Sequence, residues 1–252
     1  MRRTRASRPI DEHEPAGGVL PSDELLRPGH NCWRVARATR FRCVQDAELY
    51  FGLVRRAILA AQRTIFVLGW DIYAAVDLLP GGADDGAPTK LAELLDFAVR
   101  RRPELEVRVL VWDYAALYAL ERDPTSRIRL GWNTHERVHF RYDDFHPVAG
   151  SHHQKVVVVD DALAFSGGLD LTHHRWDTTA HAASDPRRVS ATGEPYTPFH
   201  DVQVMARLHL PIVPFEMNAP VGALRLHASG VGDVAGLDRV DAELRVQIER
   251  RA

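Results

Sequence analysis

Two residues with complementary chemistry stand near the middle of the chain, a histidine at position 153 and a lysine at position 155. Side chains alternate between the two faces of a strand, so an extended backbone would point His153 and Lys155 to the same side. An imidazole can attack phosphorus, and an adjacent ammonium group can stabilise charge on the non-bridging oxygens. The pair therefore indicates phosphoryl transfer, which it can perform without a metal.

The surrounding residues strengthen this interpretation. Chance often supplies His-x-Lys, and an exposed pair on a solvated strand is the alternative. However, Lys155 is one of two lysines in the chain, and it leads into the apolar run 156–159, which ends in Asp160. Gly167 and Gly168 follow shortly, and adjacent glycines permit close backbone approach to a substrate. We therefore interpret the region as a functional site.

These stretches resemble the first catalytic half of the phospholipase D superfamily, including its cardiolipin synthase-like members. The matching segments are 151–160, 164–171 and 175–177, and the family pattern H-x-K-x(4)-D is complete. In the stricter pattern a Gly-Ser-x-Asn follows, whereas this chain carries Gly-Gly-Leu-Asp at 167–170. That variant is familiar among the phospholipid-acting members.

The resemblance implies a role for each matching residue. His153 would form a phosphohistidine, Lys155 would bind the phosphate, and Asp160 would mainly support the motif. Asp201 resembles the family carboxylate that orients the nucleophilic histidine, fixing its tautomer and stabilising its charged form. The alternative for Asp201 is a surface aspartate at a strand edge.

The resemblance also suggests which residues line the substrate pocket. Trp70 follows the first buried strand, where core packing is an equally good explanation. The predicted substrate-binding residues are Trp70, Gly167, Gly168, Asp170, Arg175, Trp176 and Asp177.

A group of histidines raises the question of a metal. Its members are His146, His152, His173, His174 and His181. Adjacent histidines on a strand point to opposite faces, and no Cys-x-x-Cys or His-Glu-x-x-His spacing accompanies them. We therefore expect surface or loop histidines, with neither a metal nor a cofactor.

The amino-acid composition limits the classes of protein to which the chain can belong. The chain has 252 residues, 45% of them hydrophobic, which is enough for a buried core. Its 32 basic and 34 acidic residues give a formal charge of −2, so nucleic acid is an improbable partner and phosphate binding must be local. No signal peptide and no run of roughly 18 apolar residues is recognisable. We expect a cytoplasmic protein, with peripheral membrane contact possible.

The hydrophobic pattern predicts alternating helices and strands. Helices are expected from Asp46 and from Thr89, each capped by that residue, and near 114–121. Strands are expected at 64–69, 107–112, 137–142, 156–159, 162–165 and 201–205. The run 156–159 fits a strand buried on both faces. The fold class is therefore α/β, one half-domain with a largely parallel mixed sheet flanked by helices.

We divide the chain into three regions. Residues 1–30 are predicted to be a flexible leader, 31–205 a phospholipase D-like catalytic half-domain, and 206–252 a divergent tail. The spacing of Leu237, Val240, Leu244 and Ile248 favours a terminal amphipathic helix.

The family uses two motifs that face one another, one histidine attacking and the other protonating the leaving alcohol. No lysine follows Lys155, so this chain cannot hold a second His-x-Lys. Either a homodimer brings two copies of His153 together, or the chain is truncated or frameshifted after residue 205. The local sequence favours the second explanation slightly, because it resembles the first half of a two-motif enzyme.

The leading function is phosphodiester transfer on a glycerophospholipid head group, by hydrolysis or transphosphatidylation. A nuclease of the same fold is one alternative, but it would call for a basic groove. An inactive half-domain that binds lipid or protein is the other, supported by the single motif.

Overall fold

The computed structural model describes residues 27, 30–31, 38–113, 130–131, 133–145, 150–190, 192–208, 224–229 and 243–248. Most of the predicted leader and the predicted helix near 114–121 lie outside these residues. Within them, no helix is both long enough and apolar enough to cross a membrane.

Seven strands form one mixed sheet in the order β1-β7-β6-β5-β2-β3-β4. The strands are β1 (Ala38–Gln45), β2 (Thr64–Gly69), β3 (Glu106–Trp112), β4 (Val138–Asp143), β5 (Val156–Val159), β6 (Leu163–Gly167) and β7 (Val202–Leu208). The predicted α/β class with a mixed sheet is confirmed. Only β2/β3 and β3/β4 pair in parallel, whereas β1/β7, β7/β6, β6/β5 and β5/β2 are antiparallel. The sheet is thus less parallel than expected, in part because a connection as short as 160–162 can only join antiparallel strands.

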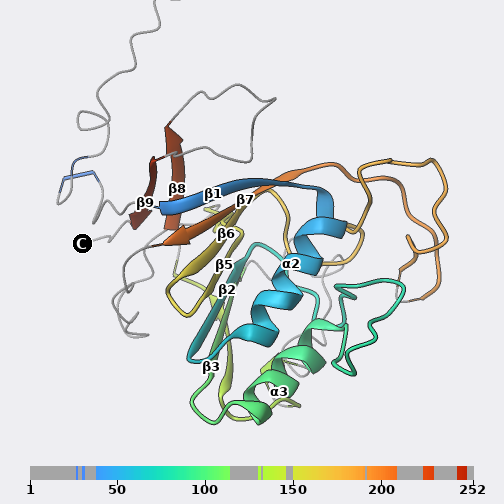
Figure 1. The fold of residues 1–252 in the computed structure, drawn as a ribbon, viewed down its shortest axis with the longest axis horizontal. Coiled ribbons are helices and arrows are strands. Elements are labelled where there is room, and N and C mark those ends of the chain that lie inside the picture. The colour runs from blue at the N-terminus through green and yellow to red at the C-terminus, as the bar shows by residue number, and fades with distance from the viewer. Residues whose placement is uncertain are drawn as a thin grey trace, which may run out of the picture.

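Two helices, α2 (Asp46–Ala60) and α3 (Leu91–Arg101), cover one face of this sheet (Figure 1). Their predicted positions are confirmed, but the predicted caps are wrong. The residues at the N-cap positions are Gln45 and Lys90, and neither makes a side-chain capping hydrogen bond. The Asp46 carboxylate accepts a hydrogen bond from the His200 ring instead. The side chain that was expected to cap α2 thus binds a residue that is distant in the sequence.

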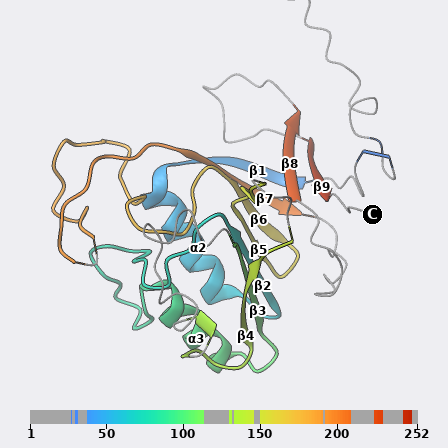
Figure 2. The same ribbon diagram turned by 180° about the vertical axis from the view of Figure 1, so that it is seen from behind.

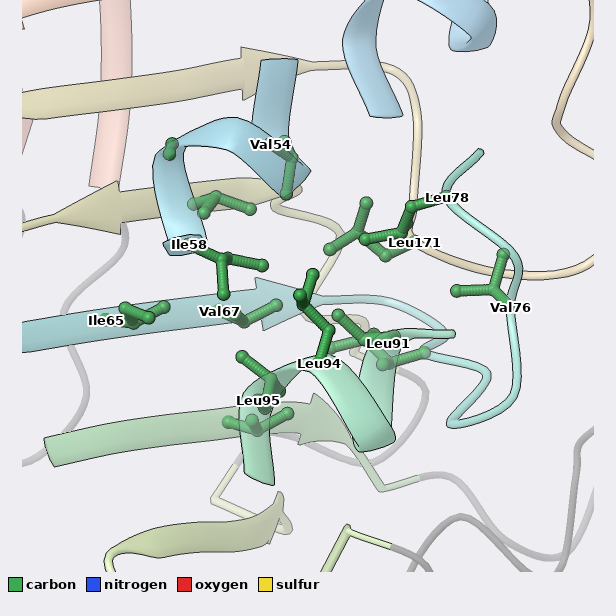
Figure 3. Packing of buried hydrophobic residues seen from close by; sticks show 14 of the residues in the cluster. Val54, Ile58, Ile65, Val67, Val76, Leu78, Leu91, Leu94, Leu95 and Leu171 are labelled. Carbon is green, nitrogen blue, oxygen red and sulfur yellow. The ribbon is translucent and has the colours of Figure 1, made fainter. Parts of the chain in front are cut away.

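The main core lies between these helices and the sheet (Figure 3). Val54 and Ile58 of α2 and Leu94 of α3 face Ile65 and Val67 of β2, with all five side chains buried. Burying an aliphatic side chain of this size contributes about 1.5–3 kcal/mol. This layer fixes β2 and β5, the two strands that carry the candidate site.

Strand β5 is buried along its whole length, as predicted. Val157 and Val159 belong to the core beneath the helices. Val156 and Val158 point to the other face, where they join a smaller cluster that includes Ala206. The two clusters hold β5 from both sides and so fix the backbone directly after Lys155.

Two further strands, β8 (Leu224–Ser229) and β9 (Glu243–Ile248), form a separate antiparallel pair. The predicted terminal helix is therefore wrong for 243–248, while positions 237 and 240 lie outside the described residues. The sequence Leu244-Arg-Val246-Gln-Ile248 also alternates with period two, so the apolar spacing that suggested a helix fits a strand equally well.

Candidate active site

One edge of the sheet gathers the residues that can do chemistry. Strands β2, β3, β4 and β6 end at this edge, and β5 and β7 begin there. The long connections 70–90 and 168–201 project from the same side (Figures 1 and 2). The residues brought to this edge are Trp70, Trp112, Asp143, His153, Lys155, Asp170 and Asp201.

Lys155 forms the centre of the site through a buried ion pair. Its Nζ lies 3.0 Å from Oδ2 of Asp170, and the two side chains are only 7% and 4% exposed. The same Nζ donates to the backbone carbonyl of His153 at 3.3 Å. Oδ1 of Asp170 accepts the Trp70 backbone N–H at 2.9 Å. The ammonium group is thus held in a fixed place before any phosphate arrives.

Burial and charge act in opposite directions on Asp170. Loss of hydration raises the pKa of its carboxyl, although Lys155 and the backbone N–H groups of Asp71 and Trp70 act to lower it. The carboxylate is therefore costly to keep ionised and depends on Lys155 to stay so.

His153 lies just before β5 and is exposed to solvent, in contrast to Lys155. Its ring meets the edge of the Trp70 ring at a centroid distance of 6.2 Å. Partial desolvation, followed by the charge of Lys155, lowers the pKa of His153, while Asp170 acts to raise it. The imidazole is consequently neutral near pH 7, the state in which it can act as a nucleophile.

Two tryptophans form a wall beside this histidine. Trp70 and Trp112 stack with ring centroids 5.6 Å apart and an interplanar angle of 25°. Trp112 is buried, whereas Trp70 is half-buried, and Nζ of Lys155 lies over the Trp70 ring, 6.0 Å from its centroid. Trp70 thus stacks on a buried ring and lies beside both His153 and Lys155, and its predicted contact with substrate stays a prediction.

Asp160 lies at the opposite end of β5 from Lys155. Its carboxylate accepts three backbone N–H groups, from Gln62 at 2.8 Å, Arg63 at 2.7 Å and Thr64 at 2.9 Å. These bonds tie the end of β5 to the start of β2. The aspartate of the motif therefore organises the two strands and stands away from the reacting groups.

Asp201 lies directly before β7, beside the two adjacent glycines. The Asp201 carboxylate accepts the Val202 N–H at 2.7 Å and lies against Gly168. One carboxylate oxygen is thus bonded to the backbone, and the predicted orientation of the histidine by Asp201 stays a prediction.

The two adjacent glycines allow the chain to pack closely at this point. A β-carbon at Gly167 would collide with Gln203, and one at Gly168 would collide with the Asp201 carboxylate. The space beside them is filled by β7 and the residue before it. The glycines permit this close packing of chain against chain, and their predicted contact with substrate stays a prediction.

The segment 175–177 splits into three different environments. Trp176 is buried in the main core, and Asp177 is completely buried. Asp177 pairs with the buried guanidinium of Arg188 at 2.9 Å and accepts the Phe199 N–H. Arg175 stacks on the Phe199 ring at 4.6 Å. Trp176 and Asp177 therefore hold the 168–201 connection together, which corrects their prediction as pocket-lining residues.

The sequence interpretation missed one feature of this edge. His152 is buried, and its Nδ1 lies 3.4 Å from Oδ2 of Asp143 at the end of β4. His152 was considered only as a surface or loop histidine. The pairing of His152 with Asp143 anchors the backbone directly before His153. The sequence signal for this pairing was the aspartate that directly follows the predicted strand 137–142.

The structure thus places an exposed histidine beside a buried lysine at one edge of a mixed α/β sheet, and comparison with known proteins identifies the family. A family model described as phospholipase D matches residues 57–201, more than half of the chain. The chain belongs to the phospholipase D family.

Individual relatives agree with this assignment. The chain is 31% identical over 156 residues to phospholipase D zeta 1 of Arabidopsis thaliana, covering 60% of this chain and 14% of that protein. It is 30% identical over 156 residues to phospholipase D2 of Bos taurus, covering 59% and 15%. The match thus spans a small part of these relatives' length.

Solved structures give a weaker likeness. A phospholipase D family member, Nuc from Salmonella typhimurium, aligns with a TM-score of 0.41 and 15% identity, covering 67% of this chain and 82% of that one. A phosphatidylserine synthase from Haemophilus influenzae aligns with a TM-score of 0.42 and 14% identity, covering 69% and 35%.

Proposed function

We propose that the chain contributes to phosphodiester transfer on the head group of a glycerophospholipid, through a covalent phosphohistidine on His153. The observation that carries this proposal is the exposed imidazole of His153 next to the buried Lys155–Asp170 pair. The relatives named phospholipase D supply the phospholipid class of substrate.

The chemistry follows from the placement of these groups. A ring nitrogen of His153 attacks phosphorus, a P–N bond forms, and the P–O bond to the head-group alcohol breaks. Lys155 stabilises the charge that develops on the non-bridging oxygens, and its fixed position means that little reorganisation is needed during the reaction. Water or an acceptor alcohol then attacks the phosphohistidine and releases His153. The first acceptor gives hydrolysis and the second gives transphosphatidylation.

The departing alkoxide needs a proton, and the same donor must later activate the acceptor. No second His-x-Lys exists in the sequence. We propose that a second copy of the chain supplies this group, so that a two-fold axis places two copies of His153 in one shared site.

Trapping the intermediate tests the chemistry. The protein is incubated with vesicles of phosphatidylcholine labelled in the diacylglycerol part, with ethanol as acceptor, and then quenched. We expect labelled phosphatidylethanol and a labelled protein adduct that acid releases, because the P–N bond is acid-labile. His153→Ala should abolish the adduct and lower turnover by a factor on the order of 10⁶.

The matched control is His139→Ala, because His139 pairs with Glu106 at the opposite edge of the sheet. This variant should keep both the adduct and turnover. An unlabelled wild-type protein, or an adduct that survives in His153→Ala, would refute the phosphohistidine. Cleavage of single-stranded DNA without cleavage of the phospholipid would favour the nuclease.

Mixing experiments test the shared site. Wild-type and His153→Ala chains are denatured together in equal amounts and refolded. If each site needs both histidines, only pairs of wild-type chains are active, and about a quarter of the activity should remain. If each chain works alone, about half should remain, which would contradict the shared site.

A further inference from the structure

Three side chains of the kind that bind transition metals meet at the start of α2. They are Asp46, His181 and His200, and one possible ligand atom from each lies within 4.8 Å of the others. Asp46 is completely buried, whereas the side chains of His181 and His200 are 30% and 57% exposed. The group therefore has a fixed base and an open side from which an ion can enter.

The distances suit a small divalent ion. Oδ2 of Asp46 lies 3.3 Å from Nε2 of His181. Two ligand atoms at about 2.0–2.1 Å from a tetrahedral zinc ion are separated by about 3.3–3.4 Å. This pair already has the required separation. His200 approaches Asp46 through Nδ1 at 2.7 Å, and its exposed ring can adjust to the ion.

A second carboxylate fixes the orientation of His181. Nδ1 of His181 lies 2.9 Å from Oδ2 of Asp177, so an N–H at Nδ1 leaves the lone pair of Nε2 facing Asp46. Asp177 is itself held by Arg188. Metal-bound histidines almost always donate their other ring nitrogen to such a partner, which sets the tautomer and increases their basicity.

The buried oxygen of Asp46 gives an independent reason to expect a cation. Oδ2 is inaccessible to solvent and has no hydrogen-bond partner among the residues that the structure describes, although the His181 ring lies beside it. Leaving a buried carboxylate oxygen without a hydrogen bond is costly. A bound cation would remove that cost.

We propose that Asp46, His181 and His200 bind a divalent transition-metal ion of the zinc type, with water as the fourth ligand. Among the five histidines considered from the sequence, only His181 takes part. The ion ties the connection 168–201 to the junction between β1 and α2. It is a structural clamp on the loop that carries Asp170, and it does not depend on the proposed phosphodiester chemistry.

Metal binding to the full chain tests the proposal. Metal-free protein at pH 8 is dialysed against micromolar Zn²⁺, and bound zinc is counted by elemental analysis. We expect His200→Ala and His181→Ala each to remove one zinc per chain. Loss of an outer partner costs roughly 10–100-fold in affinity, so loss of a direct ligand should cost at least about 100-fold.

His139→Ala is the matched control, because His139 lies 2.7 Å from a carboxylate, as His200 does, but belongs to no group of three ligands within the described part of the chain. It should bind as much zinc as the wild type. Since His200 is exposed, His200→Ala should fold normally, which circular dichroism of the metal-free protein verifies. Co²⁺ bound to the wild type should show tetrahedral d–d absorption that His200→Ala lacks.

Two results would overturn the proposal. One is a wild-type protein that takes up no zinc under these conditions. The other is a folded His200→Ala that binds zinc with unchanged stoichiometry and affinity. Both readouts are independent of turnover, so an inactive protein that still binds zinc would refute the proposed function and leave the metal site intact.

Discussion

The Lys155–Asp170 pair offers the most direct test of how the site is built. Asp170→Asn removes the negative charge but keeps the shape, so the Lys155 ammonium stays buried without its partner. Lys155→Met removes the positive charge and leaves a carboxyl that still accepts the Trp70 N–H. The two variants therefore break the same interaction from opposite sides.

The separation sets the scale of the effect. At 3.0 Å and an effective dielectric constant of about 20, two unit charges attract by about 5.5 kcal/mol. Desolvation offsets much of this energy, and removal of one partner from a buried pair typically costs about 3–5 kcal/mol. We expect that loss in the free energy of unfolding for Asp170→Asn. Lys155→Met should cost less, because burial already raises the pKa of Asp170 and the carboxyl can take up a proton.

The sign of the pH dependence follows from that raised pKa. A group that binds its proton more tightly when folded stabilises the fold at low pH and loses this contribution as the pH rises through its folded pKa. Lys155→Met should therefore regain stability as the pH falls through the folded pKa of Asp170 toward the ordinary value of 3.8. The recovery should be absent when Asp170→Asn is added.

Urea unfolding of the two single variants and the double variant completes the experiment. In the double variant no unpaired charge remains, so its loss of stability should be smaller than the sum of the single losses by at least about 1 kcal/mol. Additive losses, or single losses below about 1 kcal/mol, would refute a buried ion pair at this position.

Three substitutions and one pH profile test further parts of the fold and of the site. Gly168→Ala should destabilise the fold by about 1–3 kcal/mol in urea unfolding, because its β-carbon meets the Asp201 carboxylate. As a control, Gly52→Ala places its β-carbon in open space within α2 and should stabilise the fold by about 0.5–1 kcal/mol. Asp160→Ala should lower the free energy of unfolding by about 3 kcal/mol or more, since one hydrogen bond to a charged group contributes about 1.5–3 kcal/mol and Asp160 accepts three. A loss below about 1 kcal/mol would contradict the role of Asp160 in joining β5 to β2. The acid limb of the pH profile of kcat/KM should have its midpoint below 6.5, because the pKa of His153 is lowered and the neutral ring is the nucleophile; a midpoint above 6.5 would contradict this.

The sequence predicted well those features that depend on local pattern. The positions of α2, β2 and α3 follow from apolar spacing, and the uninterrupted run at 156–159 correctly indicated a strand buried on both faces. The spacing of apolar residues indicates burial directly, because an apolar side chain is stabilised where it faces the core. Apolar spacing led to a wrong prediction of helix at 243–248, where the structure has a strand. The few apolar residues there fit both the helical and the strand period.

The roles of polar side chains were harder to predict, because a carboxylate satisfies the nearest donors that the fold supplies. Asp46 was expected to cap its own helix, yet it bonds to His200, which is 154 positions away in the sequence. Asp201 accepts the N–H of the next residue, a bond that the motif spacing did not indicate. Sequence spacing cannot rank these donors, because long-range packing decides which of them lies within reach.

His153 and Lys155 differ in their exposure to solvent, and this difference matters because the chain has a single His-x-Lys motif. Lys155 is enclosed with Asp170, so its charge is already compensated, whereas the imidazole of His153 is exposed. A substrate that enters from the exposed side meets His153 first and must then compete with Asp170 for the ammonium group. A proton donor brought by a second copy would have to approach the exposed side of His153. The mixing experiment measures whether the protein uses such a shared site.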